Sequence, residues 1–223
     1  KLFEKEFSKW CGVKYSLCMA NRSLALSAIY KSIGLEENDE IITTPRTFIA
    51  TSSEAFLLGA KPIFAEVDRD SGNITSESIR PLINKRTKAI TVVHIAGWPA
   101  DMLEIVKLAK EYNLYLIEDC SQAHGAAIKV DGFYKSVGSF GDAAAWSFCQ
   151  DKIMTTGGEG GMVTTNRDDL WELIWTIRDH GKNRNTVFGK GYCTPIPHNR
   201  KIKREEISSE VLTKAKGLSL GYS

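Results

Sequence analysis

Short apolar runs alternate with segments of helical period along most of the chain. Runs rich in Val, Ile, Thr and aromatic residues predict strands at 40–45, 61–67, 88–96, 114–119, 143–148 and 160–166. Segments with polar starts and apolar stripes predict helices between them, at 21–34, 47–59, 75–84 and 100–113. Strands that alternate with helices indicate an α/β fold with a mainly parallel mixed sheet flanked by helices.

The pattern weakens beyond about residue 182. The stretch KNRNTVFGKGYCTPIPHNRKIKREEISSEV is polar, rich in turn residues and aperiodic. We therefore expect one large domain over residues 1–182. Residues 183–223 are expected to form a linker or the incomplete start of a small C-terminal domain.

Composition and charge limit the kinds of partner that we expect for this protein. The formal net charge is +2 and basic runs such as KIKREE are short and mixed in sign, so we expect no nucleic-acid or membrane partner. No apolar run approaches the ~20 residues that span a bilayer. The five cysteines form no CxxC pair, which favours a reducing cytoplasm over a disulfide framework.

The predicted topology points to one edge of the sheet. Ligands of parallel sheets bind at the carboxyl ends of the strands. That rule selects Asp119, at the end of the predicted strand 114–119, and the segment that follows the strand 143–148. We expect these two places to be neighbours.

Lys152 stands in the stretch SFCQDKIMTTGGEGG, among glycines and hydroxyl-bearing residues. A lysine amine becomes a nucleophile when its surroundings lower its pKa, and it then forms a Schiff base with a carbonyl group. Pyridoxal 5'-phosphate (PLP) is the common partner for that chemistry. Ser147 can offer a hydroxyl to the phosphate. Taken alone, Lys152 can also be a surface residue of a loop.

The stretch EDCSQAHGA supplies groups that suit the ring of PLP. The ring withdraws electrons only while its pyridine nitrogen keeps a proton, and a carboxylate such as Asp119 holds that proton in place. Gln122 can reach the ring hydroxyl, and Ser121 can lie against one ring face. The alternative for Asp119 is a cap of the following turn.

Two further stretches are candidates for cofactor contacts. In MANRSLALSA, Ser23 and Arg22 lie at a predicted helix start, where backbone amides bind phosphate well; the alternative is an ordinary N-cap. In TPRTFIATS, Phe48 can stack on the ring, or belong to the core. The four histidines lack metal-ligand spacing, and His94, on an apolar strand, is interpreted as a satisfied core residue.

The chain resembles the DegT/DnrJ/EryC1/StrS family of PLP-dependent nucleotide-sugar aminotransferases over residues 4–185. The resemblance is carried by Lys152 in SFCQDKIMTTGGEGG, by Asp119 in IEDCSQAHGA, and by the segments TPRTFIATSSEAFLLGAKPIFAEVD and VHIAGWPADM. It implies the aspartate-aminotransferase-like fold, fold type I.

The resemblance also implies a role for each candidate residue. Lys152 bonds the cofactor and moves the proton, and Asp119 pairs with the pyridine nitrogen. The other implied PLP contacts are Gln122 at the ring hydroxyl, Phe48 and Ser121 on the two ring faces, and Arg22, Ser23 and Ser147 at the phosphate. The expected reaction passes an amino group from glutamate to a nucleotide-linked keto-sugar in amino-sugar biosynthesis, in a homodimer.

Three features depart from the family's pattern. Many members have a Gly-Thr pair where this chain has Arg22 and Ser23, and we expect an arginine–phosphate contact instead. Many have histidine at the position of Cys149. An Asn-x-Arg-Met element and a long C-terminal lobe lack a clear counterpart here, so we expect a C-terminally truncated chain.

Two alternatives remain at the level of the sequence. The first is a truncated protein that keeps the fold as a binding or regulatory module without activity. The second is a sugar dehydratase of the same family, a class that usually carries histidine in place of the Schiff-base lysine. Lys152 disfavours the second alternative.

Overall fold

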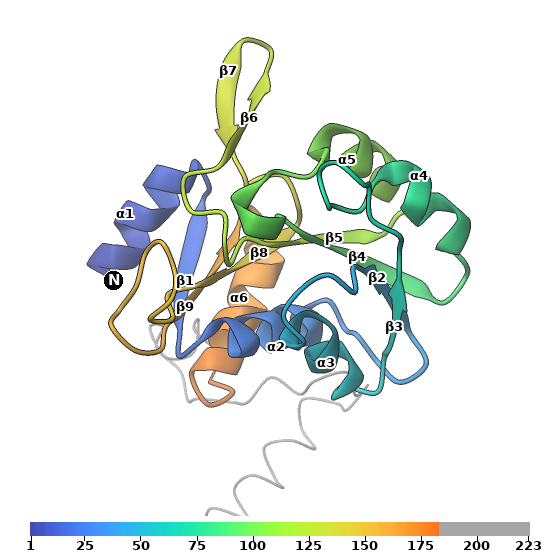
Figure 1. Cartoon of the computed structure of the whole chain (residues 1–223). Coiled ribbons are helices and arrows are strands. Elements are labelled where there is room, and N and C mark those ends of the chain that lie inside the picture. Colours follow the sequence, from blue (N-terminus) through green and yellow to red (C-terminus); the bar gives the residue numbers. More distant parts are fainter. Residues whose placement is uncertain (183–223) are drawn as a thin grey trace, which may run out of the picture. The chain divides into compact units, whose positions relative to one another are not determined.

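The computed structural model describes residues 1–182 of the chain (Figure 1). The chain divides into two compact units, Lys1–Trp171 and Glu172–Ser223. The first unit contains the sheet and the site described below. The expectations for residues 183–223 fall outside the described residues and stay predictions, as does the domain boundary at 182.

The first unit is built on a sheet that has seven strands within the described residues. Across the sheet the strands follow in the order β1 (Tyr15–Met19), β9 (Gly161–Thr165), β8 (Ala143–Ser147), β5 (Tyr115–Asp119), β4 (Thr87–Val93), β2 (Glu40–Thr43) and β3 (Lys61–Phe64). Neighbours from β3 to β8 run parallel, whereas β9 runs antiparallel to both β8 and β1. The predicted mainly parallel mixed sheet is confirmed, as are all the predicted strands.

The sequence analysis missed β1 and the hairpin of β6 (Ala127–Val130) and β7 (Phe133–Ser136). The hairpin stands out from the main sheet in Figure 1, and its residues Phe133 and Tyr134 are exposed. None of its strand residues is fully buried, and its sequence lacks the alternation of apolar and polar residues that marks a half-buried strand.

Helices cover both faces of the sheet. The helices are α1 (Leu2–Cys11), α2 (Arg22–Ser32), α3 (Ala50–Phe56), α4 (Ser76–Ile79), α5 (Met102–Glu111) and α6 (Asp168–Arg178), with short 3-10 turns at Arg80–Leu82 and Ile95–Gly97. Figure 1 shows α1, α4 and α5 on one face of the sheet and α2 and α3 on the other. None of the helices in residues 1–182 has the length and apolarity that crossing a membrane requires.

Strand β5 places side chains on both faces of the sheet, because successive residues of a strand point to opposite sides. Leu116 packs in the apolar cluster that includes Met102 and Ile105 of α5. Glu118 points to that same face, and Asp119 points to the opposite one, towards α2 and α3. Glu118 and Asp119, the last two residues of β5, therefore lie in different environments on opposite faces of the sheet.

Candidate functional site

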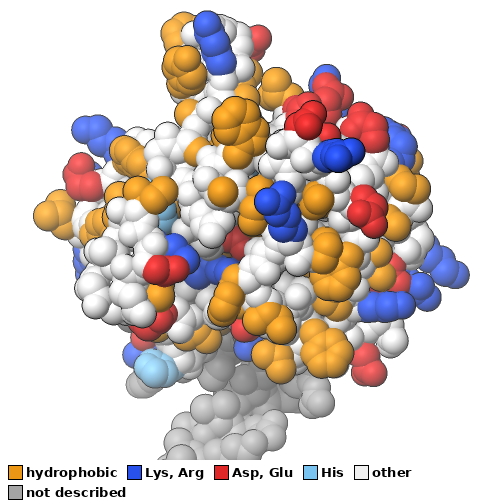
Figure 2. All heavy atoms as spheres, viewed as in Figure 1, with side chains coloured by type: hydrophobic (Ala, Val, Ile, Leu, Met, Phe, Trp, Pro, Cys, Tyr) orange, Lys and Arg blue, Asp and Glu red, His pale blue; other side chains and the backbone are white. Residues whose placement is uncertain are grey.

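A cavity of about 740 Å³ lies at the carboxyl ends of β5 and β8. This is within the range of about 300–1,000 Å³ typical of small-molecule sites. All the candidate site residues line it: Arg22, Ser23, Phe48, Asp119, Ser121, Gln122, Ser147 and Lys152. Figure 2 shows acidic and basic side chains gathered in a hollow near the middle of this face.

Parallel pairing brings these residues together. β5 and β8 are adjacent, with Asp119 opposite Ala145, so Asp119 and Ser147 end neighbouring strands. The start of α2 and the loop before α3 complete the wall on the other side. The cavity therefore lies where ligands of parallel sheets usually bind.

Asp119 is 1% exposed and is held by several donors. Its Oδ1 accepts hydrogen bonds from the Ser121 N–H at 3.2 Å and from the Ser121 hydroxyl at 2.5 Å. Its Oδ2 accepts from the Thr51 hydroxyl at 2.8 Å. The bond to the Ser121 N–H is the turn cap considered as the alternative, so Asp119 caps the turn and also faces the cavity.

Arg22 forms an ion pair with Asp119, with 3.1 Å between Arg22 Nη1 and Asp119 Oδ2. The same Nη1 donates to Thr51 Oγ1 at 3.1 Å. The Arg22 guanidinium lies 5.5 Å from the centre of the Phe48 ring. Phe48 itself is 66% exposed and belongs to the cavity wall, so the alternative of a core residue fails for it.

Gln122 is oriented by the backbone of the loop after β4. Its Oε1 accepts from the Ala96 N–H at 2.9 Å, so its amide N–H₂ group is the end left to donate. Gly97 makes this approach possible: its φ is +82°, and an added Cβ would lie 2.8 Å from the Gln122 carbonyl oxygen. The two segments therefore fix the Gln122 side chain before any ligand is considered.

The start of α2 forms one end of the cavity. The Asn21 side chain accepts from the Leu24 N–H at 2.9 Å and caps the helix. Ser23 and Ser147 line the cavity there. An added Cβ on Gly161 would lie 2.4 Å from the Asn21 carbonyl carbon, so this glycine lets β9 approach the helix start. The close contact that Gly161 permits is thus between two segments of the protein's own backbone.

Lys152 lies in the loop between β8 and β9, with its side chain 19% exposed. Its Nζ donates to Asp151 Oδ2 at 2.8 Å, and this hydrogen bond lowers the pKa of Asp151. Asp151 and Thr51 both make site contacts that sequence reasoning missed. Both lie inside stretches singled out for other residues, but local spacing gives no sign of their partners.

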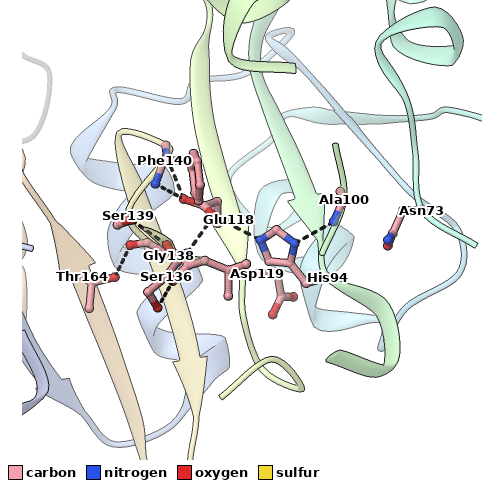
Figure 3. A network of polar contacts seen from close by, with 12 residues as sticks. Asn73, His94, Ala100, Glu118, Asp119, Ser136, Gly138, Ser139, Phe140 and Thr164 are labelled. Atoms are coloured by element: carbon pink, nitrogen blue, oxygen red, sulfur yellow. Dashed lines mark hydrogen bonds and ion pairs between the residues drawn. The ribbon is translucent and has the colours of Figure 1, made fainter. Parts of the chain in front are cut away.

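Glu118 belongs to a separate buried network on the other face of the sheet, shown in Figure 3. Its carboxylate accepts from the backbone N–H groups of Gly138, Phe140 and Gly141 at 2.7–2.8 Å. His94 Nε2 lies 3.1 Å from Glu118 Oε2, and His94 Nδ1 accepts from the Ala100 N–H. His94 is therefore the satisfied core residue that the sequence indicated.

The ligand atoms of His94, Glu118 and Cys120 lie within 4.8 Å of one another, close enough to hold a metal ion. However, both nitrogens of His94 and both oxygens of Glu118 already have hydrogen-bond partners. Burial also raises the pKa of the Cys120 thiol, and metals bind the thiolate. We interpret the group as a structural network.

The donor set of the cavity fits PLP. One cavity of suitable volume is lined by a buried carboxylate, an amide donor, two serine hydroxyls beside a helix start, and a primary amine. These are the groups that a ring nitrogen, a ring hydroxyl, a phosphate and an aldehyde require.

The model of the DegT/DnrJ/EryC1/StrS aminotransferase family matches residues 1–211. The chain is 38% identical over 190 residues to GDP-perosamine synthase of Vibrio cholerae, covering 85% of this chain and 49% of that protein. It is 41% identical over 182 residues to dTDP-3-amino-3,6-dideoxy-alpha-D-galactopyranose transaminase of Aneurinibacillus thermoaerophilus, covering 82% and 49%.

A solved structure is similar as well. The aminotransferase from Psychrobacter cryohalolentis matches with a TM-score of 0.81 at 50% identity, covering 89% of this chain and 50% of that one. The predicted fold class, that of the PLP-dependent aminotransferases of fold type I, is confirmed. The chain spans about half the length of these relatives.

Proposed function

Because this chain belongs to the DegT/DnrJ/EryC1/StrS aminotransferase family, we propose that it binds PLP in the cavity and serves the transamination of a nucleotide-linked keto-sugar. The observation that carries the proposal is that Lys152 and Asp119 line one cavity together with Ser23 and Ser147. These residues come from distant parts of the sequence, so unrelated local roles do not account for their meeting.

When bound, PLP supplies an aldehyde that bonds to a primary amine and a ring that withdraws electrons from it. Asp119 would hold the protonated ring nitrogen, because its negative charge would keep that proton in place. Gln122 turns its amide N–H₂ group to the ring hydroxyl, since its oxygen is engaged by Ala96. Phe48 and Ser121 flank the ring.

The phosphate is proposed to lie at the start of α2. The first backbone N–H groups of a helix have no partner within the helix and carry partial positive charge. The hydroxyls of Ser23 and Ser147 add donors at the same end of the cavity.

Lys152 has two tasks in this proposal. With PLP bound, its Nζ would be the primary amine that condenses with the cofactor's aldehyde, with loss of water. When not engaged in that bond, the same nitrogen would be placed to take a proton from the α-carbon of the amino donor and to return it, as a general base and then a general acid. Asp151, 2.8 Å from Nζ, keeps the lysine at the cavity wall.

The names of the relatives support a nucleotide-linked sugar as the acceptor, and we propose glutamate as the donor, as the family resemblance implies. The product belongs to amino-sugar biosynthesis, for a cell-surface polysaccharide or a secondary metabolite. We propose that the protein acts as a homodimer in the cytoplasm. Cys11, Cys120 and Cys149 are free thiols, as is usual in a reducing compartment.

Borohydride reduction tests the role of Lys152. The 223-residue chain is incubated with PLP and reduced, and its peptides are mapped by mass spectrometry. We expect the pyridoxyl group on Lys152, none on the Lys152→Arg variant, and an unchanged label on Lys152 in the control Lys107→Arg, whose lysine lies on α5 beside Glu104. A label on other lysines alone contradicts the proposal.

A second candidate is a PLP-binding unit without transferase activity. A coupled assay separates the two: the chain is given glutamate and a panel of nucleotide-linked keto-sugars, and 2-oxoglutarate is measured. Formation of 2-oxoglutarate supports transamination, and a label on Lys152 without 2-oxoglutarate supports the second candidate.

A further inference from the structure

The guanidinium of Arg22 is the counter-ion of Asp119 in this structure. The two side chains are only 8% and 1% exposed, and solvent screens such a buried pair much less than a surface pair. Arg22 also donates to the Thr51 hydroxyl, so two contacts hold the guanidinium in place. The carboxylate proposed to receive the ring nitrogen is therefore already paired with a cation.

The Asp119 carboxylate already has three hydrogen bonds and one ion-pair contact. A carboxylate offers about four lone-pair sites. Oδ1 accepts from the N–H and the hydroxyl of Ser121, while Oδ2 accepts from the Thr51 hydroxyl and contacts Arg22. Another cationic N–H donor directed at Asp119 therefore meets a carboxylate that is already crowded and already paired with a cation.

Arg22 is the donor that a protonated ring nitrogen would displace. Two cations on one carboxylate repel each other, whereas Ser121 and Thr51 are neutral. The guanidinium also lies 5.5 Å from the centre of the Phe48 ring, the aromatic ring proposed to stack on the cofactor. Arg22 thus contacts both Asp119, the residue proposed to pair with the ring nitrogen, and Phe48, the residue proposed to stack on the ring.

We propose that Arg22 is an internal competitor of the cofactor, and that its guanidinium must leave Asp119 before the ring nitrogen binds there. This inference rests on the proposed function. Only molecules in which Arg22 has left Asp119 can bind the ring nitrogen. The apparent Kd for PLP is therefore the intrinsic Kd divided by the fraction of such molecules. The chain therefore binds PLP less tightly, and exchanges it more readily, than the same cavity with a neutral residue at position 22.

The test is an equilibrium titration of the 223-residue chain with PLP, followed by absorbance. We expect the Kd of Arg22→Gln to be lower than that of the unmodified chain by about tenfold or more. The Kd for pyridoxal, which lacks the phosphate, should fall by a similar factor. The direction is diagnostic, because PLP is an anion and loss of a cavity cation would otherwise weaken its binding.

Arg46→Gln is the matched control. Arg46 lines the same cavity, but its guanidinium lies beside Gly72. We expect its Kd for PLP to stay unchanged or to rise. Circular dichroism verifies the fold of each variant. If Arg22→Gln does not fold, the neutral variant Arg22→Met replaces it, and a Kd below that of the unmodified chain supports the inference.

An unchanged or higher Kd for Arg22→Gln overturns the inference. A loss of affinity for PLP but not for pyridoxal would assign Arg22 to the phosphate instead, as the family resemblance implied. If the unmodified chain and both arginine variants all fail to bind PLP, the proposed function fails, and the inference falls with it.

Discussion

At the scale of single residues, Glu118 and Asp119 are adjacent carboxylates with different roles. Because side chains alternate between the two faces along a strand, Glu118 lies among backbone N–H groups whereas Asp119 faces the cavity. Burial by itself raises the pKa of Glu118, but the hydrogen bond from His94 and those from the backbone outweigh burial and lower it. Glu118 therefore stays ionised and ties the segment 138–141 to β5.

We predict that Glu118→Gln lowers the free energy of unfolding by about 3 kcal/mol or more, because a glutamine amide cannot accept all the bonds that the carboxylate accepts. Urea denaturation measures the loss. The matched control is Glu104→Gln on α5, where the exposed pair with Lys107 should contribute little, so that the loss of stability is much smaller. Equal losses in the two variants would contradict the role of the network.

The contribution of Glu118 should depend on pH. Its pKa in the folded protein lies below the ordinary value of 4.5, so the stability that it provides is fully present above pH 4.5. This stability is lost as the pH falls through the lower, folded-state pKa. The difference in unfolding free energy between the unmodified chain and Glu118→Gln should be constant above about pH 5 and narrow below it, as denaturation curves at several pH values would reveal. A difference that widens towards acid pH would be contrary to this expectation.

At the scale of elements, the site depends on how closely β9 approaches the start of α2. Gly161 stands at that contact, and any Cβ there would overlap the Asn21 carbonyl group. The helix start is proposed to hold the phosphate, so its position relative to Ser147 of β8 decides whether one anion reaches both. A glycine in a strand thus positions a helix terminus.

We predict that Gly161→Ala lowers the unfolding free energy by about 1–3 kcal/mol, the range typical of overpacking, and raises the Kd for PLP. Urea denaturation and PLP titration measure the two effects. Gly158→Ala, in the loop just before β9, is the control, because no atom lies within 4 Å of an added Cβ there. Its effect should stay within about 0.5 kcal/mol. If Gly158→Ala proved as damaging as Gly161→Ala, the close contact would not be the cause.

At the scale of the whole molecule, a ligand that binds only the folded chain stabilises all of it. With PLP at 100 times its Kd, the free energy of unfolding should rise by about 2.7 kcal/mol. Chemical denaturation followed by tryptophan fluorescence measures the rise. At the same PLP concentration the rise should be smaller for Lys152→Ala, which lacks the amine that bonds the aldehyde. No rise at saturating PLP would mean that PLP does not bind preferentially to the folded chain.

Much of the fold was predictable because burial leaves a local pattern in the sequence. The strands of the parallel part of the sheet are apolar runs between helices, and each was predicted. Helix α1 was missed because Lys1 precedes it without a capping side chain, so no local signal marks its start. The hairpin of β6 and β7 was missed because its exposed residues Phe133 and Tyr134 follow no buried alternation.

The sequence by itself determined which chemical groups are present and at which strand or helix ends they lie. Asp119, Ser147 and Lys152 were identified in this way, since each stands beside an element that a local pattern reveals. Only the tertiary structure decided which groups meet. Thr51 bonds to Asp119 across 68 residues of sequence, and Arg22 reaches the same carboxylate from a third element. Such partners depend on which strands are adjacent and on which face each side chain points to, and no local pattern encodes both.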